Sequence, residues 1–196
     1  MAIFSRQGLI TELLDRTELI KAGSAAFLRL TDEELGFSPG PGTWSIVEVF
    51  GHLNLCNEIY IRYILPRVTL APDRPSDDFS STWLGDWAYE KIVPRPDGSV
   101  FRMNTAKAVR PAKPKDDVSE VLHHFHRTCD ALDDILRHSA TKDLRRIRIP
   151  FHFIPLLHFS LGETLRFVIA HNERHLLQAQ RLLNDHCSGI VQQRPF

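Results

Sequence analysis

Hydrophobic residues recur every three or four positions in four long segments of the chain, which is the spacing of one apolar face on an α-helix. These segments span about residues 5–30, 45–66, 116–139 and 160–185. We expect a break in the first of them near Gly23. The pattern therefore predicts four amphipathic helices.

Short polar motifs mark the ends of these helices. Two pairs of residues fit the capping box, in which each side chain satisfies the other residue's free backbone N–H: Ser45 with Glu48, and Ser160 with Glu163. Asp116 or Asp117 can cap the third helix. Pro66 is expected to end the second helix.

Strands are not strongly indicated anywhere. Residues 147–159 contain β-favouring side chains, but Pro150 and Pro155 limit them to a loop or a short edge pairing. Four long amphipathic helices predict an all-α, four-helix bundle, and 196 residues fit a single domain over residues 1–196. The connection over residues 67–115 is too long for a turn, so it predicts a crossover that allows the second and third helices to run parallel.

That connection holds two further features. Trp83 and Trp87 are four residues apart, which suggests a short helix over the end of the bundle, with both rings as additional core rather than a pocket wall. Between residues 102 and 115 there are five basic side chains and no acidic one. They can attract an anionic substrate, although a solvated linker is the favoured interpretation.

Composition narrows the class of protein. Basic and acidic residues both number 24, so the net charge favours neither nucleic acid nor an anionic membrane as a partner. The sequence has no apolar run of the roughly 18 residues that a membrane-spanning helix needs. Cys56, Cys129 and Cys187 are odd in number, widely spread and form no CxxC motif, as expected of reduced thiols. We expect a soluble, cytoplasmic protein.

Three histidines are the main candidates for chemistry. His171 and His175 are four residues apart in the last predicted helix, so both imidazoles project from the same face. His52 lies in the second predicted helix. If the two helices pack side by side, three neutral imidazoles can converge on one transition-metal ion.

A zinc protease of the HExxH type is not indicated. In that motif the catalytic glutamate directly follows the first histidine. Here Glu173 is two residues after His171, about 200° around the helix, so it points away from a shared ion.

Other polar residues are candidates for supporting roles near the site. Glu48 is one turn before His52 and can accept its second ring N–H, although capping of its own helix is the favoured role. Gln178 lies on the face of the histidine pair and can line the site, and Arg174 can reach an anionic group or form a surface salt bridge. His126, on the third predicted helix, is the substitute ligand should one of the three histidines fail.

The segments TWSIVEVFGHL and GETLRFVIAHNERHLLQAQRLL resemble the DinB-like superfamily, which includes YfiT-like metal-dependent hydrolases. The resemblance covers the Trp-Ser opening of the second helix, its His52, and the His171/His175 pair. It implies a four-helix bundle in which these three histidines bind nickel, zinc or a similar divalent ion. It also implies a small-molecule substrate, because relatives include transferases of low-molecular-weight thiols, and it allows a homodimer.

Three classes of function follow from these features. In a metal-dependent enzyme, a hydrolase or thiol transferase, the ion lowers the pKa of bound water or holds a thiol as thiolate. A non-catalytic, stress-related metal- or ligand-binding protein would have the same site without turnover. In a packing protein, the histidines would only fill the bundle and function would lie on its surface.

Overall fold

Four long helices form the body of the molecule. The computed structural model describes residues 2–73, 78–95, 99, 101, 105–112, 117–154 and 156–192. The long helices are α1 (Arg6–Ser24), α3 (Ile46–Leu70), α5 (Val118–Ser139) and α6 (Leu161–Gln192). Both α1 and α3 pack against α5 and α6, which confirms the all-α fold expected from the periodicity.

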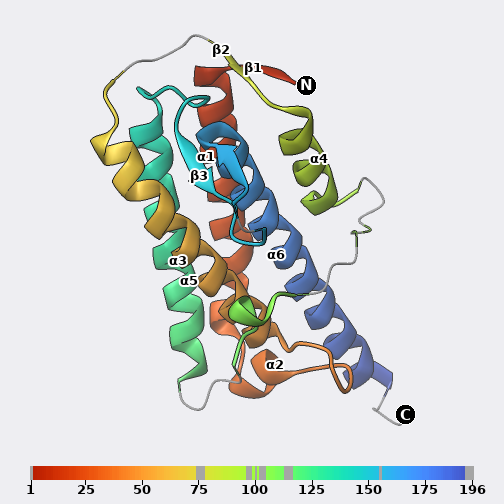
Figure 1. Ribbon diagram of the computed structural model, residues 1–196. Coiled ribbons are helices and arrows are strands. Elements are labelled where there is room, and N and C mark those ends of the chain that lie inside the picture. The colour runs from red at the N-terminus through yellow and green to blue at the C-terminus, as the bar shows by residue number, and fades with distance from the viewer. Residues whose placement is uncertain are drawn as a thin grey trace.

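The long connection lies between α3 and α5. In Figure 1, α1 and α6 run down the page, whereas α3 and α5 both run up it. The second and third long helices are therefore parallel, as a long crossover allows. The described part of this connection contains β2 (Asp78–Ser80), α4 (Trp83–Ile92) and the 3₁₀ turn η2 (Lys107–Val109).

The capping motifs set the starts of the helices. Ser45 and Glu48 form the complete capping box at α3, and Ser160 and Glu163 exchange the same bonds at α6. Asp117 caps α5, while the alternative cap Asp116 lies outside the described residues.

The prediction that Pro66 ends the second helix is wrong, because α3 continues to Leu70. Proline removes one N–H donor from a helix interior, and this loss costs about 3 kcal/mol. The last turn is retained because it buries Val68 completely against the core. Burial of such a side chain contributes about 1.5–3 kcal/mol, which offsets most of that cost.

Short elements complete the fold. Near Gly23, α1 gives way after Ser24 to the 3₁₀ turn η1 (Ala25–Arg29). The helix α2 (Asp32–Gly36) follows, with a capping box that the sequence analysis did not identify. The strand β1 (Ile3–Ser5) pairs antiparallel with β2, and β3 (Arg148–Pro150) pairs with β4 (His158–Ser160), the short pairing expected between residues 147 and 159.

The helix α4 packs beside α6 rather than burying its tryptophans. Trp83 and Trp87 are 72% and 51% exposed, so the prediction that they extend the core is wrong. The face of α4 that meets α6 includes Gly85, where a Cβ atom would lie 2.3 Å from the Glu163 carboxylate. Only glycine permits this approach, which lets Glu163 accept hydrogen bonds from both the N–H and the hydroxyl of Thr82, the cap of α4.

Aromatic and aliphatic side chains fill the space between the helices. Phe50 on α3 makes edge-to-face contacts with Phe27 and with Phe125 on α5. In the part of the chain that the structure describes, no helix is long and apolar enough to cross a membrane. All three cysteines are free thiols.

Candidate metal centre

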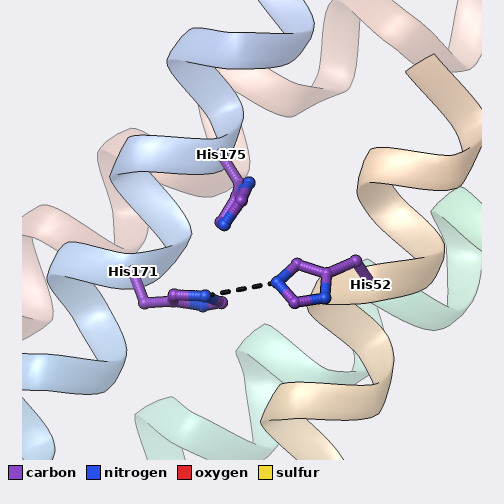
Figure 2. A group of neighbouring side chains, drawn as sticks. All are labelled: His52, His171 and His175. Carbon is purple, nitrogen blue, oxygen red and sulfur yellow. Dashed lines mark hydrogen bonds between the residues drawn. The ribbon is translucent and has the colours of Figure 1, made fainter. Parts of the chain in front are cut away.

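His52, His171 and His175 meet between α3 and α6. Figure 2 shows His52 projecting from α3 toward the two histidines on α6. One ring nitrogen of each residue lies within 4.8 Å of the others, and Nε2 of His52 is 3.3 Å from Nε2 of His171. The i,i+4 spacing on α6 and the packing of two helices distant in sequence together produce this cluster.

A buried amide pair fixes how α3 and α6 align. Asn57 and Asn172 each donate from Nδ2 to the other's Oδ1 at 3.0 Å. The second amide proton of Asn57 goes to Thr128 Oγ1 on α5, and that of Asn172 goes to the Val168 carbonyl. Since a one-residue slip of either helix would break these bonds, the pair holds His52 opposite His171.

The second ring nitrogens of two histidines have oxygen partners. Nδ1 of His52 lies 2.7 Å from the Val109 carbonyl, and Nδ1 of His175 lies 2.8 Å from Oε1 of Gln178. Both oxygens accept, so each Nδ1 carries the proton and each Nε2 presents its lone pair to the cluster. The partner of His52 Nδ1 is thus Val109 rather than Glu48, whose carboxylate accepts from the N–H and hydroxyl of Ser45.

The surroundings keep the three imidazoles neutral. Burial lowers the pKa of His52 and lowers that of His171 well below its ordinary value, where the neighbouring His175 and His52 rings add to the effect. For His175, burial and then His52 lower the pKa to about 3. Neutral imidazole is the form that binds a metal ion.

Apolar and aromatic groups enclose the cluster. The Trp44 ring packs 4.9 Å from the His52 ring and 6.3 Å from the His175 ring, measured between centroids. The ring of Phe167, one turn before His171, stacks on the His171 ring with their centroids 6.2 Å apart. Cys56 Sγ lies 3.7 Å from His52 Nε2, but burial raises the pKa of this thiol to about 12, so it stays protonated.

The donor set fits a divalent transition-metal ion. A tetrahedral ion with metal–nitrogen bonds of about 2.0–2.1 Å separates neighbouring nitrogens by about 3.3–3.4 Å, and the His52–His171 separation of 3.3 Å agrees. Two facing Nε2 lone pairs repel, so this geometry requires either a proton on His171 or a cation between the rings. Among the described residues, only these three meet as a possible ligand group.

Other polar residues near the site have partners elsewhere. Glu173 accepts two hydrogen bonds from Arg16 on α1, at 2.6 and 2.7 Å, so it points away from the histidines as predicted. His126 contacts Ser24 at 3.2 Å and is not part of the cluster. Arg174 donates to the carbonyl of Phe101.

A protein-family model described as the DinB superfamily matches residues 18–179, which include all three histidines, the whole of α3 and α5, and parts of α1 and α6. The chain belongs to the DinB superfamily. In this DinB-superfamily chain the buried three-histidine cluster is compatible with metal binding. Neither the comparison with curated proteins nor that with solved structures found a matching relative.

Two parts of the centre were not identified from the sequence. The Val109 carbonyl that orients His52 belongs to the backbone, and a backbone carbonyl has no residue-type signal. Trp44 precedes the cap of α3 and was noted only as part of the family resemblance, although its ring covers two of the histidines.

Proposed function

We propose that this chain is a divalent-metal-dependent enzyme, a hydrolase or low-molecular-weight-thiol transferase, whose site is His52, His171 and His175. The observation that carries the proposal is the convergence of three neutral imidazoles, two of which have their second nitrogen hydrogen-bonded to oxygen. Nickel and zinc are the proposed ions, since imidazole ligands accept both.

The chain's own residues bind and orient in this proposal. The Val109 carbonyl and Gln178 hold two rings with Nε2 toward the ion. Three neutral ligands leave the full double charge of the ion uncompensated, and three protein ligands with one open position are typical of catalytic sites. When bound, such an ion lowers the pKa of a coordinated water or thiol.

Trp44 touches both the histidine cluster and a pocket at the start of α3. A cavity of about 480 Å³ lies against the loop before α3, and its lining includes Trp44 and Glu48. The same indole ring contacts His52. We propose that a small molecule approaches the histidines past this residue.

A non-catalytic metal- or ligand-binding protein is the second candidate. One observation favours it: the acidic residues adjacent to the histidines in sequence, Glu48 and Glu173, are engaged with Ser45 and Arg16. Neither of these two residues is therefore assigned as a general acid or base.

Metal analysis of protein prepared without a histidine tag tests the site. We expect about one zinc or nickel ion per chain and its loss in His171→Ala, because two imidazoles bind such ions far more weakly than three. His126→Ala is the matched control and should retain the ion, since this residue contacts Ser24 instead. Wild-type protein without a stoichiometric ion after loading would contradict the proposal.

Turnover separates the two candidates. The metal-loaded protein should either conjugate a low-molecular-weight thiol to an electrophile or hydrolyse an ester or amide, and His171→Ala should abolish that activity. A loaded wild-type protein that turns over neither class of substrate would favour the binding function.

A further inference from the structure

Arg174 carries a positive charge without a matching negative charge. It lies on α6 between His171 and His175, and its Nη2 donates to the carbonyl of Phe101 at 2.5 Å. Its Nη1 is enclosed but has no hydrogen-bond partner. Within the described part of the chain, no ion pair joins Arg174 to a carboxylate.

An enclosed N–H without a partner lowers the stability of the ligand-free protein. A buried polar donor without a partner costs about 1–3 kcal/mol, and more when the group is charged. Burial lowers the pKa of Arg174, but a guanidinium keeps its proton at neutral pH. This unpaired N–H can donate to an acceptor group of a bound ligand.

The charge of Arg174 acts on the histidine cluster itself. Beyond burial, which is the main cause, the guanidinium contributes to the lowered pKa of both His171 and His175. A divalent ion on three neutral imidazoles would therefore lie in the field of another cation. Glu173, the nearest acidic residue in sequence, is already paired with Arg16 and does not offset this charge.

A second positive side chain contacts Phe101. Nζ of Lys91, on α4, lies 4.5 Å from the centre of the Phe101 ring, while the carbonyl of Phe101 accepts from Arg174. Farther along the connection, Lys107 and Arg110 are exposed. Arg174 and Lys91 thus bring two positive charges to Phe101.

We infer that Arg174 binds the carboxylate of a small ligand whose other end reaches the ion on the three histidines. The inference rests on the proposed function and gives its ligand a chemical class: an anionic thiol or substrate, not a neutral one. The planar guanidinium suits this role because two of its N–H groups can meet both oxygens of a carboxylate. The competing interpretation is that Arg174 only anchors the backbone at Phe101.

Binding to cobalt-loaded protein tests the inference without measuring activity. The probes are ω-mercaptocarboxylates of three to six carbons, each compared with the ω-mercaptoalcohol of equal length. The thiolate-to-cobalt absorption band and titration calorimetry give the Kd of each. A short mercaptocarboxylate can bind the ion through both its sulfur and its carboxylate. Longer probes are included because this chelate ring becomes unfavourable as the chain lengthens, so that a carboxylate preference then reports on Arg174.

At the best chain length the carboxylate should bind about tenfold to a hundredfold more tightly than the alcohol, the range for one hydrogen-bonded charged group. Arg174→Gln should reduce this preference to about one, because the Kd of the carboxylate should rise far more than the Kd of the alcohol. Arg62→Gln removes the same charge from an exposed site on α3 and should keep the preference. If Arg174→Gln does not fold, Arg174→Lys decides, because loss of the planar guanidinium should still weaken the preference several-fold.

The outcomes distinguish the two proposals. Failure to bind cobalt, or the absence of a thiolate band with every probe, would overturn the proposed function. Cobalt binding with bands for both classes of thiol, but with no carboxylate preference or one that survives the Arg174 variants, would overturn only this inference.

Discussion

Two oxygen atoms determine which ring nitrogen of His52 and of His175 faces the metal centre. The Val109 carbonyl and the Gln178 side chain each accept from an Nδ1, so the lone pairs of His52 and His175 point inward before any ion arrives. Partners of this kind fix the tautomer and raise the basicity of a ligand. Gln178 is the one whose side chain can be replaced.

Gln178→Leu should lower the affinity for zinc about tenfold to a hundredfold, the usual effect of losing such a partner. Competition with a chromophoric chelator measures the change. Gln180→Leu is the control, because Gln180 is exposed on the same helix. Equal losses in both variants would show that the change acts through α6 as a whole rather than through His175.

At the scale of single residues, the sequence predicted the side chains of the site better than the backbone atoms that orient them. The i,i+4 pair on α6 was visible because helical periodicity converts spacing into direction. The sequence also indicated two roles for Glu48, to cap its own helix or to accept from His52, and the structure shows Glu48 in the capping role. The Val109 carbonyl was not indicated, since any residue at that position would present the same atom.

Among the elements, α3 and α6 carry the site and the Asn57–Asn172 pair joins them. Each amide makes its bonds across or along these helices in a fully buried environment. Buried polar groups that satisfy one another specify an alignment, whereas apolar contacts alone tolerate shifts.

Asn172→Leu should destabilise the metal-free protein by about 2–4 kcal/mol, because the buried Asn57 amide loses both hydrogen bonds to Asn172 and keeps only the one to Thr128. Asn57→Leu/Asn172→Leu should lose less than the sum of the two single variants. Urea unfolding measures all three. Strict additivity would contradict a coupled pair.

Element boundaries were harder to predict than the elements themselves. The helix α3 passes through Pro66 because the buried Val68 lies beyond it, and burial of a single residue depends on the tertiary fold. The tryptophans of α4 show the same limit. The spacing predicted a helix correctly, but the smaller Gly85 and Ala88 are the buried residues, and Gly85 approaches Glu163 of α6.

Over the whole molecule, folding moves three titratable rings from water into an enclosed centre. The unfolded chain binds a proton at His175 below its ordinary pKa of 6.5, whereas the folded chain does so only near pH 3. Because the unfolded state then binds more protons, the free energy of unfolding must fall as the pH decreases through this window.

For the metal-free protein, His175 should contribute a slope of up to about 1.4 kcal/mol per pH unit between about pH 6 and pH 4. Urea unfolding at several pH values, with a chelator present, measures it. His175→Gln removes the titrating ring, so its stability should depend less steeply on pH. Parallel curves for both proteins would show that this imidazole does not titrate on unfolding.

The placement of the three indoles gives the molecule a built-in optical reporter. Trp44 lies against two of the histidines, whereas Trp83 and Trp87 are largely exposed on α4. Replacing the outer two with phenylalanine would leave one fluorophore beside the imidazoles. Its emission should then be quenched by paramagnetic cobalt or nickel and barely altered by zinc, so occupancy could be followed in real time and without a substrate.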